Sequence, residues 1–245
     1  GAVAGFSSAS ILIVQNNPPF YTATNGWPLL FEGNGGAQAV GGALYVDHCT
    51  NLFVQRAAMI TNNALNSAVQ CDGTVFCFDQ CAIGGHGAFA VSAQNSTGTM
   101  MGCTLTANYG ALSLTDARVA VSNSIFWGNT LLFSTNRASL PVACSDVQGG
   151  YPGIGNINAD PKLYANYHLK SISPCRNAGG PGAAIVDVDG ENRSGNWDMG
   201  CDEFLDNDGD ALPNIVETGT GVKQSDINMG SNPNNPHSDS DTVND

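Results

Sequence analysis

The sequence carries little charge and few positive residues. Asp, Glu, Lys and Arg make up 12% of the 245 residues, about half of the roughly 25% that is usual in globular proteins. Lys and Arg number only 8, against 21 Asp and Glu. We therefore expect no nucleic-acid partner, because neutralising phosphates requires clustered Lys and Arg. The net charge of −13 would also repel polyanionic substrates such as pectate.

Long hydrophobic runs are also missing. No run of about 18 apolar residues occurs, so we expect no transmembrane segment. Residue 1 is Gly, so we expect that a signal peptide has been removed or lies upstream. In place of charge, the chain has 30 Gly and many Asn, Ser and Thr, a composition typical of secreted β-structure. Its eight cysteines, an even number, fit an oxidising compartment without proving one.

A short repeat runs through the first half of the chain. Four segments share a run of apolar or small residues that ends in an amide or an imidazole: AAMITN (57–62), CAIGGH (81–86), CTLTAN (103–108) and SIFWGN (124–129). They begin 24, 22 and 21 residues apart, and β-prone stretches bounded by Gly, Asn or Ser lie between them. Each turn of roughly 22 residues therefore contains about three short strands, with no helical period in the region.

This spacing predicts an all-β fold, a right-handed parallel β-helix. A sandwich or a barrel also contains short strands bounded by turns, but neither requires equal positions to recur at a fixed interval. In a parallel β-helix, each coil stacks its strands on the equivalent strands of the next coil, roughly 4.8 Å away. The sequence must then repeat once per coil, as it does here.

The repeat places four polar residues, Asn62, His86, Asn108 and Asn129, at one corner of the solenoid. Stacked Asn side chains hydrogen-bond along the solenoid axis and satisfy backbone groups at a turn. We expect His86 to belong to this ladder. The alternative is that His86 is a catalytic base.

The same spacing applies to the cysteines. A separation of 22 residues places Cys81 above or below Cys103 in neighbouring coils, and it places Cys49 near Cys71. Stacked thiols buried in the core are one interpretation, since a free Cys packs as a small hydrophobic residue. A disulfide between stacked positions is the alternative, and it is geometrically demanding.

From residue 123 onward, the sequence resembles the end of a known family. The motifs are VSNSIFWGNT, CSDVQGGYPGIGNINADPKL, YHLKSISPCRNAG and DVDGENRSGNWDMGCDEF. They are similar to bacterial secreted β-helix proteins of the choice-of-anchor type, relatives of pectate-lyase-like and polymorphic outer-membrane repeats. The resemblance covers about residues 34–204. It implies a closing cap that folds back over the last coils and contains Pro161 and Pro174, with a Cys175–Cys201 disulfide. It implies a surface location but no particular activity.

The negative charge is concentrated in the second part of the chain, where residues 151–245 carry fifteen carboxylates and five Lys or Arg. Within it, DNDGDALPNIVE (206–217) has the spacing of a twelve-residue calcium loop, because alternating oxygen ligands on a tight loop converge on one hard Ca²⁺ ion. The ligands at positions 1, 3, 5, 7, 9 and 12 would be Asp206, Asp208, Asp210, the Leu212 carbonyl, Asn214 and Glu217. Ala211 stands where such loops have Gly, although Gly209 lies nearby.

A weaker copy of the loop follows in SNPNNPHSDSDTVND. Asp239, Asp241 and Asp245 fit positions 3, 5 and 9, and Val243 would supply the carbonyl at position 7. His237 stands at position 1, and the sequence stops before position 12. The two loops resemble thrombospondin type 3 repeats, which bind calcium. The alternative is a disordered acidic linker.

We therefore expect a parallel β-helix with its closing cap over residues 1–204 and a thrombospondin type 3-like calcium-binding segment over 205–245. The function expected first is a secreted or cell-surface structural or adhesive protein stabilised by calcium. The uncharged, β-prone start GAVAGFSSASILIVQ also suggests head-to-tail self-association into a filament, since the open end of a solenoid must be covered. The alternative is that the chain begins in the middle of a solenoid.

A carbohydrate-active enzyme is the second function class, because many parallel β-helices act on polysaccharides. Glycoside hydrolysis needs two carboxylates on one face. The solenoid offers only four Asp outside the start, at 47, 72, 79 and 116, and they form no repeating pair. Asp79 and His86 are the best candidates, and we predict no catalytic residue. A module that binds a surface polysaccharide without chemistry lies between the two classes.

Overall fold

The computed structural model describes the backbone of residues 3–6, 11–14 and 30–32, and the backbone and side chains of 42–61, 67–164, 167–182 and 186–236. Within these ranges the secondary structure is almost entirely β. It consists of short strands and one turn of 3-10 helix, η1 (Asn214–Val216). No helix of the described part is long and apolar enough to cross a membrane.

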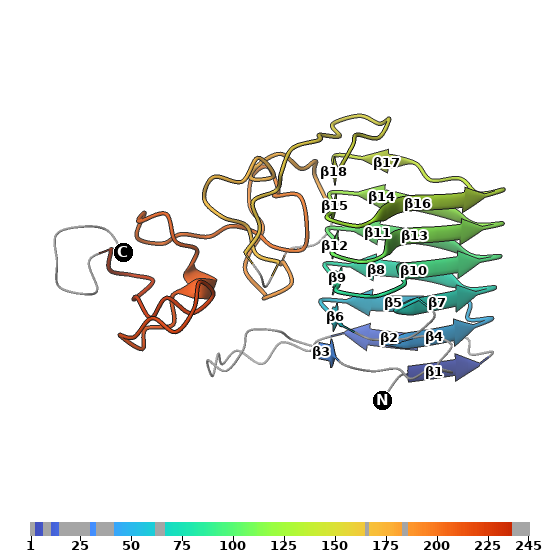
Figure 1. Cartoon of the computed structure of the whole chain (residues 1–245), viewed down its shortest axis with the longest axis horizontal. Helices are drawn as coiled ribbons and strands as arrows, with labels where there is room; N and C mark the ends of the chain where they lie inside the picture. The colour runs from blue at the N-terminus through green and yellow to red at the C-terminus, as the bar shows by residue number, and fades with distance from the viewer. Residues whose placement is uncertain are drawn as a thin grey trace.

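The strands form three parallel sheets, and each sheet receives every third strand of the chain (Figure 1). Sheet A consists of β1 (Val3–Phe6), β4 (Leu44–Asp47), β7 (Val69–Asp72), β10 (Phe89–Gln94), β13 (Gly110–Thr115) and β16 (Leu131–Asn136). Sheet B consists of β2 (Ile11–Val14), β5 (Leu52–Gln55), β8 (Val75–Asp79), β11 (Thr97–Met101), β14 (Arg118–Ser122) and β17 (Val142–Ala143). Sheet C consists of β3 (Leu30–Glu32), β6 (Ala58–Ile60), β9 (Ala82–Gly84), β12 (Thr104–Thr106), β15 (Ile125–Trp127) and β18 (Asp146–Val147). The predicted parallel β-helix is confirmed.

The core lies inside the three sheets, because alternate side chains of each strand point inward. Val46, Cys71, Ala93 and Leu114 are aligned across four neighbouring strands of sheet A, and all four are buried. Their neighbours along each strand are more exposed, as the two-residue period of a strand requires. Parallel register thus places like residues on like residues, and this stacking explains the sequence repeat.

The amide ladder at the corner between sheets C and A is present. The backbone N–H of His86 donates to Asn108 Oδ1 (3.2 Å), and that of Asn108 donates to Asn129 Oδ1 (3.1 Å). The Nδ2 of each Asn donates to a backbone carbonyl of the preceding coil. His86 is buried and its Nε2 hydrogen-bonds the Met59 carbonyl (2.8 Å). The ladder is confirmed for these three residues, and Asn62 lies outside the described residues.

The corner between sheets B and C carries a second ladder, built from thiols and hydroxyls. Cys81 and Cys103 are stacked in neighbouring coils, since the N–H of Thr104 donates to the Cys81 carbonyl (2.9 Å). The N–H of Cys103 donates to Ser124 Oγ, and the N–H of Ser124 donates to Ser145 Oγ, both at 3.1 Å. Both thiols are free and buried, so the buried-thiol interpretation is confirmed here.

Cys49 lies near Cys71 but not in the equivalent position of the next coil. Val46 is the residue paired with Cys71, so this coil is 25 residues long. Cys49 instead stacks on Thr74, whose Oγ1 accepts the N–H of Cys49 (3.3 Å). Burial and the neighbouring Cys49 thiol raise the pKa of Cys71.

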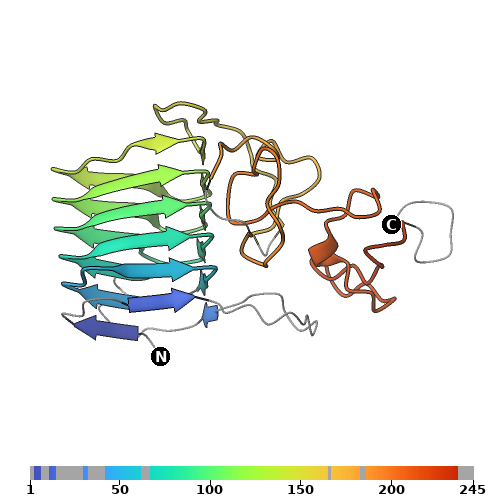
Figure 2. The same ribbon diagram turned by 180° about the vertical axis from the view of Figure 1, so that it is seen from behind.

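The described residues between 148 and 204 form an irregular cap along the outer face of sheet C (Figures 1 and 2). After β18 the chain runs back beside the sheet, so the cap covers a side of the solenoid. The N–H of Cys201 donates to Thr104 Oγ1 of β12 (3.0 Å). Val188 and Cys201 pack against Ala58 of β6. The cap thus contacts several coils along sheet C, including β6 and β12, whereas the family resemblance implied a cap over the last coils.

The expected Cys175–Cys201 disulfide is wrong, because all eight cysteines of the chain are free. Cys175 lies in an apolar cluster with Leu169, and its Sγ donates to Asp146 Oδ2 (3.3 Å). Cys201 lies in a different cluster, with Val188. Each thiol therefore fills its own packing site against sheet C.

Candidate metal centre

The candidate metal centre lies in the segment that follows the cap (Figure 1). This segment has little regular structure, and backbone hydrogen bonds bring its two halves together. The N–H of Met229 donates to the Val216 carbonyl (2.8 Å), and the N–H of Gly219 donates to the Ser231 carbonyl (2.7 Å). Residues 229–231 are therefore hydrogen-bonded to the chain at the C-terminal end of the loop 206–217.

Asp206 shapes the first half of the loop. Its Oδ1 accepts the N–H of Gly209 (2.7 Å), and its Oδ2 accepts the N–H of Ala211 (3.1 Å). Gly209 has φ +81° and Ala211 has φ +80°. The loop thus takes a left-handed turn at Ala211 itself, where a Cβ costs about 1–2 kcal/mol. Gly209 does not relieve this strain, because it makes a left-handed turn of its own.

The three Asp of the loop gather around one point. Asp206, Asp208 and Asp210 each offer a carboxylate oxygen, and these oxygens lie within 4.8 Å of one another. Both carboxylate oxygens of Asp208 are buried and accept no hydrogen bond. Buried carboxylate oxygens without a donor are costly, so this arrangement favours a cation among the three side chains.

Glu217, at position 12 of the loop, faces the same carboxylates. Its side chain is buried, and neither Oε accepts a hydrogen bond of normal geometry. Burial, followed by the charges of Asp210, Asp208 and Asp206, raises the pKa of Glu217 to about 7, while the nearby Ser231 hydroxyl opposes the shift. A divalent cation would remove this repulsion.

Leu212 and Asn214 make contacts within the loop. The N–H of Leu212 donates to Asp210 Oδ1 (2.8 Å). Asn214 joins the two ends of the loop, because its Oδ1 accepts the N–H of Asn207 (2.9 Å) and its own N–H donates to the Leu205 carbonyl (2.8 Å). Their roles as calcium ligands stay predictions.

The ligands expected in the second loop, which are Asp239, Asp241, Val243 and Asp245, lie outside the described residues, as does His237. The preceding turn is described, and the N–H of Asn235 donates to the Asn232 carbonyl (2.9 Å). The second calcium loop therefore stays a prediction.

Sequence reasoning missed a second group of acidic side chains, inside the cap. Asp187, Glu191 and Asp202 each offer an oxygen within 4.8 Å of the others, and Asp202 also lies with His168 and Asp189. The signal in the sequence was the alternation of carboxylates in DVDGE (187–191), which resembles the start of a calcium loop.

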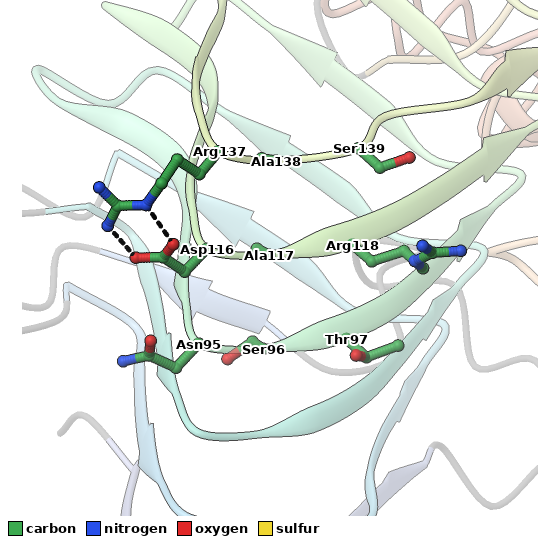
Figure 3. Close-up of a pocket in the computed structure, with 9 residues that line it drawn as sticks. All are labelled: Asn95, Ser96, Thr97, Asp116, Ala117, Arg118, Arg137, Ala138 and Ser139. Atoms are coloured by element: carbon green, nitrogen blue, oxygen red, sulfur yellow. Dashed lines mark hydrogen bonds and ion pairs between the residues drawn. The ribbon is translucent and has the colours of Figure 1, made fainter.

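An open polar pocket of about 500 Å³ lies across the corner between sheets A and B (Figure 3). Its one carboxylate, Asp116, forms a two-point ion pair with Arg137, in which Nε donates to Oδ1 at 2.6 Å. The Arg137 hydrogen bonds lower the pKa of Asp116. Glycoside hydrolysis requires two carboxylates, which this pocket does not offer.

The structure does not bring Asp79 and His86 together. Asp79 is buried at the end of β8 and accepts hydrogen bonds from Gln55 Nε2 (2.7 Å) and Gln80 Nε2 (3.1 Å). His86 belongs to the ladder at another corner. Neither side chain is placed as a general acid or base beside the other.

Comparison with known proteins adds no family. No protein-family model matches the sequence, and no curated protein matches it at a significant level.

Proposed function

We propose that this protein is an extracellular structural or adhesive β-helix whose C-terminal segment is stabilised by calcium. The observation that carries the proposal is the set of buried carboxylate oxygens of Asp208 and Glu217, which accept no hydrogen bond of normal geometry and face further carboxylates. An oxygen-only cluster in a loop with this ligand spacing is the chemistry that Ca²⁺ prefers.

The resemblances seen in the sequence support the same proposal. The motifs of residues 123–204 resemble secreted choice-of-anchor β-helix proteins, and the acidic segment resembles thrombospondin type 3 repeats. A surface rich in Asn, Ser and Thr suits an extracellular protein. The solenoid would provide a stiff body, and calcium would order the segment that follows it.

Calcium should stabilise the C-terminal segment before it affects the solenoid. A ligand that binds only the folded form adds about 2.7 kcal/mol at a hundredfold excess over Kd. In EDTA, we expect limited proteolysis to cut within residues 205–236 while the solenoid stays intact, and we expect the melting temperature to fall. The replacement of Asp208 by Asn together with Glu217 by Gln should reproduce the effect of EDTA on cleavage within residues 205–236.

The control is Asp226→Asn. Asp226 lies in the same segment, but its carboxylate is exposed and pairs with Lys223 Nζ (3.3 Å). This variant should keep the full response to calcium. Identical cleavage patterns and melting curves with calcium and with EDTA would show that the loop is not a calcium site.

Head-to-tail association is a second role that the solenoid supports. In sheet A, the end strands β1 and β16 each pair with a single strand of the described part of the chain, so backbone groups at both ends of this sheet remain for pairing, whereas β18 of sheet C also bridges Ile157. Deleting residues 1–14, which removes β1 and β2, should abolish any polymer and leave the β-sheet circular dichroism largely intact. A monomer by light scattering at high protein concentration with calcium, in the undeleted chain, would contradict this role.

A further inference from the structure

The group of acidic side chains inside the cap is organised by one of its own members. Asp187 Oδ1 accepts three backbone N–H groups, from Asp189 (3.0 Å), Gly190 (2.9 Å) and Glu191 (2.8 Å). Its Oδ2 accepts the N–H of Glu203 (2.9 Å). Asp206 likewise accepts backbone N–H groups of the residues that follow it in the loop 206–217. The tight turn after Asp187 brings the carboxylates of Asp187 and Glu191 close together, with one oxygen of each within 4.8 Å of the other.

The charges in this part of the cap do not balance. Four carboxylates lie here, those of Asp187, Asp189, Glu191 and Asp202, against the imidazole of His168 and the buried Arg56, whose Nε donates to the Val188 carbonyl (3.3 Å). Arg193 is also near, but its guanidinium is committed to Gln80 Oε1 (2.6 Å) and Glu203 Oε2 (2.9 Å). Burial and mutual repulsion raise the pKa of Asp187, Glu191 and Asp202. Unbalanced buried carboxylates require a cation or protons.

One oxygen of Asp202 has no hydrogen-bond donor. Asp202 is 2% exposed, and its Oδ2 accepts the N–H of Leu169 (2.7 Å). Its Oδ1 is buried and accepts no hydrogen bond. His168 Nε2 lies 3.8 Å from this oxygen and is already hydrogen-bonded to Asp189 Oδ2 at 2.6 Å. Asp202, which lies in one group with Asp187 and Glu191, therefore has one buried oxygen without a hydrogen bond, and the partner of this oxygen among the described residues is the His168 imidazole at 3.8 Å.

We propose that Asp187, Glu191 and Asp202 bind a calcium ion inside the cap. The three ligands are all carboxylate oxygens, which suit a hard cation with flexible coordination. The imidazole of His168, which a softer ion such as Zn²⁺ would prefer, is engaged with Asp189. Glu191 is only partly buried, so the ion can enter from its side.

This ion would fasten the cap to the solenoid. Asp187 precedes Val188, which packs on Ala58 of β6, and Asp202 follows Cys201, which is hydrogen-bonded to β12. The N–H of Val188 donates to the Cys201 carbonyl (2.9 Å), so the two ligand-bearing stretches already lie side by side. A cation between them would remove the repulsion between the carboxylates of the two stretches and so stabilise their contact. The site is independent of the loop 206–217.

The test uses the full chain with the ligands of its two other predicted calcium loops replaced. In this background variant, Asn replaces Asp208, Asp239 and Asp241, and Gln replaces Glu217. After EDTA treatment and dialysis into calcium, native mass spectrometry should count one calcium ion per chain. Asp202→Asn should reduce the count to zero, because the amide keeps an oxygen for Leu169 but removes the free carboxylate oxygen. Glu191→Gln, at a partly exposed position, should do the same.

The control within the cap is Asp160→Asn, which removes an exposed carboxylate paired with Lys162 and should leave the count at one. Melting temperature supplies a second readout, because Asp202→Asn should melt above the background variant in EDTA and below it in calcium. A background variant that binds no calcium, or that binds Zn²⁺ or Mn²⁺ in preference, would overturn the proposal. The loop proposal fails separately, if the intact chain binds no more calcium than the background variant.

Discussion

Ala211 offers a test of whether the loop 206–217 folds together with calcium binding. Its φ of +80° is in the left-handed region, where a residue with a Cβ pays about 1–2 kcal/mol. Glycine avoids this cost. It also gives the unfolded chain more conformational freedom, which lowers the free energy of unfolding by about 0.4–1 kcal/mol. Since Ala211 is exposed, its methyl group contributes little packing. We expect Ala211→Gly to stabilise the folded loop by about 0.5–1 kcal/mol.

The gain should appear as tighter calcium binding. Without the ion, the repulsion among Asp206, Asp208, Asp210 and Glu217 opposes the folded loop, so binding and folding are coupled. A gain of about 0.5–1 kcal/mol corresponds to roughly a two- to fivefold lower Kd, since 1.4 kcal/mol is tenfold. Competition between the protein and a fluorescent calcium chelator measures this difference directly.

A matched control exists in the solenoid. Ala107 is also exposed and has φ +56°, at the corner beside Asn108. Ala107→Gly should stabilise the solenoid by a similar amount and leave the calcium Kd unchanged. If Ala211→Gly left the Kd unchanged or weakened it, or if both variants tightened binding equally, the coupling between loop folding and calcium would be refuted.

Three further predictions concern the solenoid and the cap. Asn108→Ala should destabilise the protein by about 2–3 kcal/mol in denaturant unfolding, because it leaves buried backbone groups of the ladder unpaired. The control Ser113→Ala, on the outer face of sheet A, should change the free energy of unfolding little. Burial raises the pKa of Asp146 from 3.8 to about 6, so the folded form favours the protonated acid and stability falls as pH rises through this window. Asp146→Asn should remove that loss, and its advantage over the wild type should grow by about 2–3 kcal/mol from pH 4 to pH 7; an advantage that does not change with pH would contradict the pKa shift. Peptide mapping after alkylation of the native, unreduced protein should find no disulfide cross-link. The partly exposed Cys144 should be alkylated early, and the fully buried Cys201 only on unfolding. A Cys175–Cys201 cross-link would contradict the packing described above.

The solenoid could be predicted because the environment of each position repeats from coil to coil. Positions such as Cys81, Cys103 and Ser124 occupy the same corner in successive coils, so one spacing fixes both register and environment. Where a coil changes length, spacing alone misleads. The offset from Val46 to Cys71 is 25 residues, and therefore Cys49 stacks on Thr74.

The cap and its acidic cluster could not be predicted in this way. The cap has almost no strands, and its contacts join residues far apart in the sequence, such as Thr104 and Cys201. Asp187 and Asp202 come together only because both stretches fold against sheet C. In the loop 206–217 the ligands are local, so the spacing was enough to predict that Asp206, Asp208 and Asp210 converge.

A crystal structure of the full chain grown with calcium, with an anomalous difference map, tests calcium binding by the loop most directly. We predict a peak among Asp206, Asp208, Asp210 and Glu217, with carboxylate oxygens at about 2.3–2.6 Å from the ion. A well-ordered loop 206–217 that holds no ion at saturating calcium would contradict the proposal.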